Sequence, residues 1–225
     1  MSKPKLLIFA SGTKIGGGSG FENLVQASRS GALGTEIVGV VSNHENGGVR
    51  ERADRLGVPF IYFGGPWEAE HYQRVVKDSG AEWVMLSGWL KFVKGLDPMR
   101  TFNIHPALLS FDHGRFGGPG MYGHHIHEAV AEALEKGEIT NSGCSMHFTT
   151  EEYDRGPIFF EYRVPLEKGM TAETIAKVVQ AAEHEWQPKI TNMVVHELIR
   201  WDGKDANTLV VPKGYSFLPN HDAVA

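Results

Sequence analysis

Asn103 and His105 lie two residues apart in a segment that ends at Pro106. On an extended strand this spacing places both side chains on one face, and the proline marks the end of the strand because it cannot donate to a sheet. The amide and the imidazole are then expected side by side at the carboxyl end of a strand, where open α/β sheets hold their sites. Two hydrogen-bond donors in this position suit a reaction in which negative charge builds on a carbonyl oxygen.

A carboxylate far downstream is expected to complete this group. Asp154 lies in a Tyr-Asp-Arg-Gly-Pro turn, from which it could reach His105 and hold the imidazole in its charged form. His147 precedes it on a predicted strand and is expected either to line the same cleft or to have a structural role. Each motif alone has a simpler interpretation, because Asp favours turns and Asn often caps them. The prediction therefore depends on all these residues meeting in space.

A glycine-rich loop follows the first apolar segment. Residues 11–20 contain five glycines and lead into a predicted helix, whose positive end and free N–H groups favour an anion. The loop matches neither the dinucleotide pattern nor the Gly-Lys-Ser/Thr ending of a nucleoside-triphosphate loop. We predict a phosphomonoester site here; a flexible turn without ligand is the alternative. The expected phosphate-binding residues are Gly17, Gly18, Ser19 and Gly20.

Two other kinds of chemistry are disfavoured by the residue pattern. His124, His125 and His127 resemble part of a zinc site, but only Glu128 stands nearby at ligand spacing, so no metal is predicted. A Ser-His-Asp hydrolase would need a Gly-x-Ser-x-Gly turn after a strand, and the sequence has none.

The composition is that of an ordinary globular protein. The chain has 225 residues, 41% of them hydrophobic and 22% charged, with a net charge of −5 that argues against broad nucleic-acid binding. Its single cysteine, Cys144, fits a reducing compartment. The first apolar run, residues 6–10, is too short for a signal peptide or a membrane span. We expect a cytoplasmic monomer or homodimer that acts on small molecules and binds neither nucleic acid nor membrane.

The order of elements predicts an α/β fold with a Rossmann-like, mostly parallel sheet and helices on both faces. The expected strands are residues 6–10, 36–42, 59–63, 83–86, a part of 99–104, 142–149 and 157–164. The expected helices are residues 21–30, 49–56, 67–79, 124–137 and a long region 171–200 broken near Pro188. Residues 110–122 form a long irregular loop. A single domain over residues 1–203 is followed by a tail, 204–225, with a short strand at 209–211.

Residues 83–93 form an apolar strand that runs into an aromatic turn. This segment is either part of the core or the wall of a flat pocket for a ring system, with backbone groups that supply hydrogen bonds.

Taken together, these motifs resemble the folate-dependent formyltransferases over nearly the whole chain. The matching segments are residues 87–91 (Ser-Gly-Trp-Leu-Lys), 103–109 (Asn-Ile-His-Pro-Ala-Leu-Leu), 143–148 (Gly-Cys-Ser-Met-His-Phe), 154–158 (Asp-Arg-Gly-Pro-Ile) and the pair Glu183-His184. The chain departs from the family pattern in its longer glycine loop and at Ser110, where a proline is expected.

The resemblance implies transfer of a formyl group from 10-formyltetrahydrofolate, as co-substrate, to the amine of glycinamide ribonucleotide. It implies that Asn103 and His105, as an imidazolium, stabilise the oxyanion while Asp154 stabilises His105. The folate would contact Leu90, Lys91, Phe92, Val93 and Asn103, with the Lys91 side chain itself in solvent. His147 and Glu183 would contact the substrates. Another acceptor, either a sugar-nucleotide amine or water, and a folate-binding protein without catalysis remain the alternatives.

Overall fold

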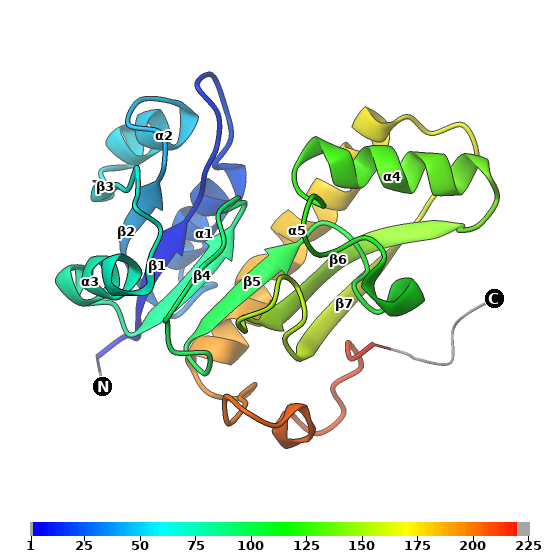
Figure 1. Cartoon of the computed structure of the whole chain (residues 1–225). Helices are drawn as coiled ribbons and strands as arrows, with labels where there is room; N and C mark the ends of the chain where they lie inside the picture. Colours follow the sequence, from blue (N-terminus) through cyan, green and yellow to red (C-terminus); the bar gives the residue numbers. More distant parts are fainter. Residues whose placement is uncertain (1, 220–225) are drawn as a thin grey trace.

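The computed structural model describes residues 2–219, and within them a seven-stranded sheet forms the centre of the fold (Figure 1). Its strand order is β3-β2-β1-β4-β5-β6-β7. The first five strands are parallel: β1 (Lys5–Phe9), β2 (Glu36–Ser42), β3 (Phe60–Tyr62), β4 (Trp83–Ser87) and β5 (Thr101–His105). The last two strands are β6 (Asn141–Phe148), which is antiparallel to β5, and β7 (Ile158–Pro165), which is antiparallel to β6. The predicted mostly parallel sheet is confirmed.

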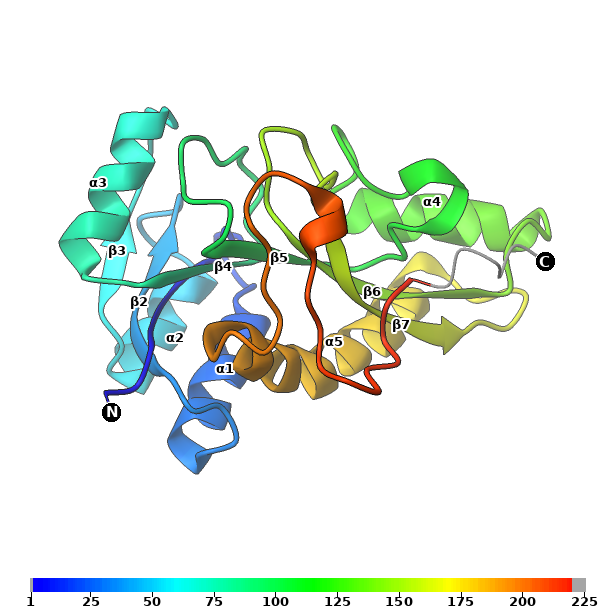
Figure 2. The ribbon, with the colours of Figure 1, turned by 90° about the horizontal axis from the view of Figure 1, so that it is seen from below.

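Helices cover both faces of the sheet, as Figure 2 shows from below. The helices are α1 (Ser19–Ser30), α2 (Gly48–Leu56), α3 (Ala69–Ser79), α4 (His124–Glu135) and α5 (Ala172–Val195), with short 3-10 helices η1 (Phe111–Gly114) and η2 (Ala206–Thr208). Alternation along β1 explains the two layers: Leu7 and Phe9 belong to the core beneath α3, whereas Leu6 and Ile8 belong to the larger core with α1 and α5.

Helix α5 is continuous through Pro188, so the predicted break at this residue is wrong. Proline removes the hydrogen bond to the carbonyl group four residues earlier, which is that of His184. Here the side-chain amide of Asn23, on α1, donates to this carbonyl oxygen at 2.7 Å. A tertiary contact thus replaces the missing bond within the continuous helix.

The predicted tail strand at 209–211 is reduced to one bridge between Arg200 and Val210. The chain then runs beside β7, where Phe217 accepts a hydrogen bond from the backbone of Glu161 and packs against Phe160. The end of the predicted tail, residues 220–225, lies outside the described residues. Within residues 2–219 we find no helix whose length and apolar character would let it cross a membrane.

The strand order also fixes the place of the site. The chain adds β2 and β3 on one side of β1 and β4 and β5 on the other, so the order reverses between β1 and β4. Ligands of open α/β sheets bind outside the carboxyl ends of the strands at such a reversal. The glycine loop after β1 and the ends of β4 and β5 all lie at this edge.

Candidate active site

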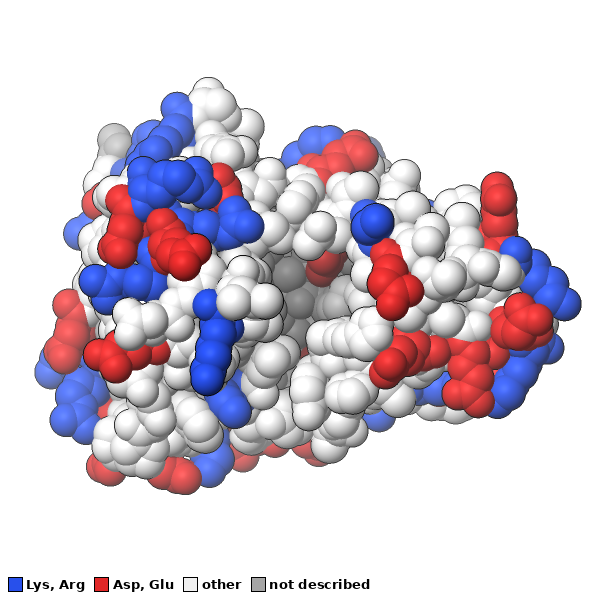
Figure 3. Space-filling view, turned by 90° about the horizontal axis from the view of Figure 1, so that it is seen from above, with Lys and Arg blue, Asp and Glu red and all other residues white. Residues whose placement is uncertain are grey.

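A cavity of about 510 Å³ opens at the carboxyl ends of β1, β4 and β5. Figure 3 looks onto this edge of the molecule and shows the hollow, bordered mainly by uncharged residues. The lining residues come from 12–20, 87–90, 103–106, 118–126, 153–154 and 180–187. Segments far apart in the sequence therefore meet around one space.

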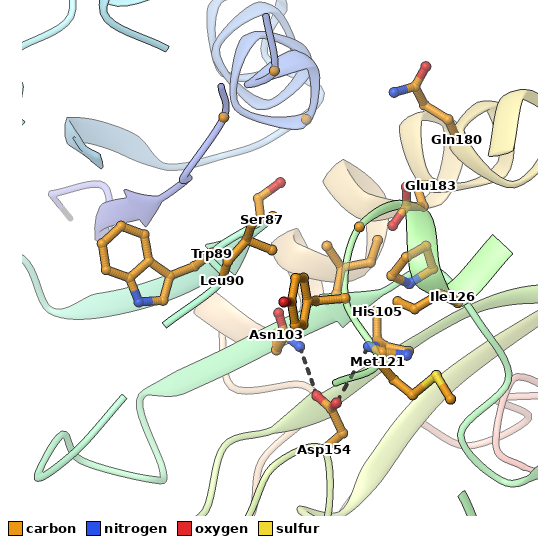
Figure 4. A pocket seen from close by; sticks show the side chains of 18 of the residues that line it. Ser87, Trp89, Leu90, Asn103, His105, Met121, Ile126, Asp154, Gln180 and Glu183 are labelled. Atoms are coloured by element: carbon orange, nitrogen blue, oxygen red, sulfur yellow. Dashed lines mark hydrogen bonds and ion pairs between the residues drawn. The ribbon is translucent and has the colours of Figure 1, made fainter. Parts of the chain in front are cut away.

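Asn103, His105 and Asp154 converge at one end of this cavity (Figure 4). The first two share a face of β5, as their spacing predicted. Asp154 lies with one carboxylate oxygen 3.4 Å from the amide nitrogen of Asn103 and the other 3.6 Å from Nδ1 of His105. The sequence prediction that these three side chains meet is thus satisfied by the geometry.

Asp154 is held as a carboxylate. Its backbone is in the left-handed region, at φ 52°, and the N–H of Gly118 donates to it at 2.9 Å. Burial raises the pKa of Asp154, but the hydrogen bond with His147, the charges of His105 and His147 and the N–H of Gly118 outweigh this and lower the pKa to about 2. The group therefore carries its negative charge throughout the physiological pH range.

Burial acts against the charged form of His105 that the resemblance implies. The ring is 4% exposed, and burial lowers its pKa, as does the neighbouring His147, against the opposing effects of Asp154 and the Phe116 carbonyl. Nε2 lies 2.7 Å from the carbonyl oxygen of Phe116 and so must carry the proton. Nδ1, on the other side of the ring, faces the Asp154 carboxylate.

His147 contacts both Asn103 and Asp154. Its Nδ1 lies 2.8 Å from the Phe148 carbonyl oxygen and so carries a proton, and its Nε2 lies 3.2 Å from the amide nitrogen of Asn103. The same Nε2 is 3.4 Å from Asp154. His147 lines a separate pocket of about 60 Å³ and not the main cavity. His147 thus contacts Asn103 and Asp154 from the side of the smaller pocket.

The four predicted phosphate residues line the opposite end of the cavity, at the first turn of α1. Gly18 caps this helix in the left-handed conformation, at φ 79°, and no side chain caps its free N–H groups. The Ser19 hydroxyl lies 3.1 Å from Nε2 of Gln180 and 3.3 Å from Nε2 of His184. A helix N-terminus with added hydroxyl, amide and imidazole groups suits a phosphate.

Gln180 and the site role of His184 were missed from the sequence, although a signal existed. Residues 180, 183 and 184 have the helical spacing that puts them on one face, and Glu183 had already been singled out. Glu183 lines the cavity from α5, and burial raises its pKa to about 8. Such a carboxyl group is ready to exchange a proton with an amine near neutral pH.

The predicted folate segment after β4 is divided between the two cavities. Leu90 lines the main cavity, whereas Lys91, Phe92 and Val93 line the 60 Å³ pocket. The Phe92 ring lies 4.5 Å from that of Tyr153 across the small pocket. The Lys91 ammonium group lies 4.5 Å above the Trp67 ring.

The three histidines of α4 do not converge. His124 and His125 each contact Glu128 at 3.2 Å on the helix surface, whereas His127 is buried among the core residues. Burial lowers the pKa of His127 to about 4. No group of three potential metal ligands occurs among residues 2–219.

The fold, the phosphate-type loop and the Asn-His-Asp group together define a transferase of the formyl transferase class. The chain belongs to this family, whose model, described as "Formyl transferase", matches residues 5–191.

Its relatives include a chloroplastic phosphoribosylglycinamide formyltransferase of Arabidopsis thaliana, 31% identical over 210 residues, with 88% of this chain and 68% of the relative covered. The Vigna unguiculata protein of the same name is 31% identical over 212 residues, with 88% and 63% covered. Among solved structures, glycinamide ribonucleotide transformylase 1 from Symbiobacterium toebii is similar with a TM-score of 0.77 and 26% identity, covering 94% of this chain and 95% of that one.

Proposed function

We propose that this protein transfers the formyl group of 10-formyltetrahydrofolate to the amine of glycinamide ribonucleotide, a step of purine biosynthesis. The observation that carries the proposal is one cavity with a phosphate-type site at one end and an Asn-His-Asp group at the other. Figure 4 shows Gln180, Glu183 and His105 in succession along its wall. This order matches a ribonucleotide that has a phosphate at one end and an amine at the other.

The amine attacks the formyl carbon, and the electron pair of the carbonyl bond moves to oxygen. The Asn103 amide nitrogen gives up its contact with Asp154 and donates a hydrogen bond to this oxyanion instead. The contact with Asp154, at 3.4 Å, is the longer of the two that the nitrogen makes. His105 accepts the amine proton at Nδ1, and Asp154 stabilises the imidazolium that results. When the intermediate collapses, the carbonyl bond reforms, the bond to N10 of the folate breaks, and N10 receives the proton.

Glu183 is proposed to bind the incoming amine. It lies on the cavity wall between the phosphate-type site and His105, and burial raises its pKa to about 8. The positive charge of an arriving ammonium group favours the ionised form of Glu183. The carboxylate can then accept the proton whose loss frees the nucleophile. The amine then reaches the formyl carbon in its unprotonated form.

The folate is proposed to enter from the Leu90 side, with its ring directed into the 60 Å³ pocket. That pocket has room for about two water molecules as it stands. The contact between Phe92 and Tyr153 therefore separates as the ring enters. The proposal requires no metal, because the amide, imidazole and carboxylate supply the charge stabilisation. It includes a cytoplasmic location and a monomeric or homodimeric state.

The acceptor is tested by product analysis. Purified protein is incubated with 10-formyltetrahydrofolate and, separately, with glycinamide ribonucleotide, an amino-sugar nucleotide, or buffer alone, and products are identified by mass spectrometry. We expect rapid formylation of glycinamide ribonucleotide only. Formate release at the same rate without any amine, or faster formylation of the sugar nucleotide, would refute the proposal. Folate binding without turnover in any reaction would indicate a binding protein.

Replacing Ser19 with alanine is expected to raise KM for the ribonucleotide about tenfold, because a hydroxyl bond to a charged phosphate is lost. The KM for folate should stay within twofold, since the Leu90 side of the cavity is untouched. Steady-state kinetics with each substrate varied gives the result. Ser30→Ala, at the other end of α1, is the matched control and should behave as wild type. Equal effects on both KM values would show that the loop is a general folding element.

Leu90→Asp is expected to weaken binding of a folate analogue about tenfold to a hundredfold, because an apolar wall is lost and a charge is added beside the folate carboxylates. Calorimetry measures the affinity. Leu90 is 41% exposed, so the variant should fold, and Leu198→Asp, at a 52% exposed leucine outside the cavity, is the control. Unchanged affinity in the Leu90 variant would place the folate elsewhere.

A further inference from the structure

A row of polar side chains extends the candidate site sideways across the sheet. In the strand register, His105 on β5 pairs with Ser145 on β6, and Ser145 pairs with Glu161 on β7. Directly paired residues of antiparallel strands point to the same face. Ser145 is fully buried and Glu161 is 8% exposed, and neither lines the main cavity. A buried carboxylate two strands away from the substrate space needs an explanation, because burial of a charge is costly unless it is well paired.

The Glu161 side chain contacts Ser110, at the start of the loop that leaves β5, and Ser145 on β6. One of its carboxylate oxygens accepts from the backbone N–H of Ser110 at 2.9 Å, and the other accepts from the Ser110 hydroxyl at 2.6 Å. Ser145 lies 2.9 Å from the first oxygen. The Ser145 hydroxyl accepts from the N–H of Leu109 at 3.0 Å and contacts the carbonyl oxygen of Ala107 at 2.7 Å. Two buried side chains thus fix residues 107–110.

Ser110 is also the position at which the family pattern predicts a proline. A proline has neither an N–H nor a hydroxyl group, so neither contact with Glu161 could form. The contact between the Glu161 carboxylate and Ser110 therefore depends on the serine that replaces the expected proline.

The loop that Glu161 fixes returns directly to the Asn-His-Asp group. After η1 it presents the Phe116 carbonyl oxygen to Nε2 of His105 at 2.7 Å and the Gly118 N–H to Asp154 at 2.9 Å. On the way, Asp112 and His113 both have positive φ angles, 42° and 56°. Residues other than glycine adopt this conformation only when the surrounding structure holds them there. An anchor at the start of the loop supplies such a restraint.

We propose that Glu161 is a positioning residue for formyl transfer. Through Ser110 and Ser145 it fixes the loop whose Phe116 carbonyl holds the proton of His105 on Nε2 and so leaves Nδ1 free to accept the amine proton. Glu161 itself touches no substrate. This inference depends on the proposed function for its kinetic consequence, but its effect on His105 is independent of any substrate.

The kinetic test compares wild type with Glu161→Gln, Ser110→Ala and the double variant. Arg163→Gln is the control, because Arg163 lies two residues after Glu161 on the same face of β7 but is exposed. Turnover of glycinamide ribonucleotide is expressed per folate-binding site, counted by calorimetric titration with a folate analogue. We expect kcat per site to fall about tenfold in each single variant, since small displacements of reacting groups have effects of this size or larger. The KM for the ribonucleotide should stay within twofold. The double variant should be no slower than the slower single variant, because both changes break one contact.

Ser110→Thr keeps the hydroxyl group and should keep most of the activity. A merely structural role would lower the melting temperature and the number of active sites but leave kcat per site unchanged, and that result would overturn the proposal. Multiplicative losses in the double variant would overturn it as well, since the two residues would then act separately.

A second readout separates this inference from the proposed function. The Nε2 proton of His105 is followed by NMR in the protein without substrate. We expect a protected signal in wild type and in Arg163→Gln, and faster exchange with solvent in Glu161→Gln and Ser110→Ala. An unchanged signal in both variants would refute the positioning role whatever the enzyme formylates. Absence of turnover in wild type, with the expected NMR changes, would refute the proposed function alone.

Discussion

Asp154→Asn is expected to lower kcat about a thousandfold, within the range known for loss of a group that assists proton transfer. The asparagine keeps the size of the side chain but removes the charge that stabilises His105 once it has accepted the amine proton. Because the carboxylate has a pKa of about 2, the loss should be constant across the physiological pH range. Steady-state kinetics from pH 6 to 9 measures it.

Asp97→Asn serves as the control for this substitution. Asp97 also accepts a backbone N–H in a turn, that of Met99, but it lies outside the cavity. Its asparagine variant should retain wild-type kcat. A loss in the Asp154 variant of less than about fivefold, with the protein folded, would show that the carboxylate has no part in the chemical step.

Glu183→Gln is expected to lower kcat/KM for the ribonucleotide about a hundredfold, since the amine loses the group proposed to accept its proton. The carboxyl group has a pKa of about 8, so wild-type kcat/KM should rise with pH up to about that value. This dependence should be absent from the glutamine variant. Glu185→Gln, at an exposed position two residues later on α5, is the matched control. A glutamine variant that keeps the wild-type profile would assign the titration to another group.

The raised pKa of Glu183 also predicts that the stability of the protein falls as the pH rises, whereas kcat/KM rises. This pKa is raised from an ordinary value of 4.5 to about 8 in the folded protein, so the unfolded chain gives up its proton first as the pH rises. Wild-type stability should therefore decline between about pH 4.5 and 8, and this decline should be smaller in Glu183→Gln. Thermal unfolding of both proteins at pH 5 and pH 8.5 tests this. An equal decline in the two proteins would contradict the burial of Glu183 as its cause.

The sequence predicted the strands, the glycine loop and the shared face of Asn103 and His105 because these depend on local rules. Apolar runs, the two-residue strand period and turn residues are written in residue types. The same rules place the last residues of parallel strands at one edge of a sheet. For this reason a cleft could be proposed before any geometry was known.

What the sequence could not show depends on tertiary contacts. The Phe116 carbonyl and the Gly118 N–H act through the backbone, which gives no signal in residue type. Helix α5 continues through Pro188 because Asn23, distant in sequence, contacts the freed carbonyl group. Burial opposes the effect of Asp154 on the pKa of His105, and the sequence gives no sign of that burial. Each of these depends on packing that local pattern does not record.

The central claim is that His105 and Asp154 act as one unit on the amine proton. A double-mutant cycle with His105→Ala, Asp154→Asn and the combined variant tests it most directly, with kcat/KM for formylation of glycinamide ribonucleotide as the measurement. The account predicts that each single variant loses about a thousandfold and that the double variant loses little more than either. A double variant whose loss is the product of the two single losses would contradict it.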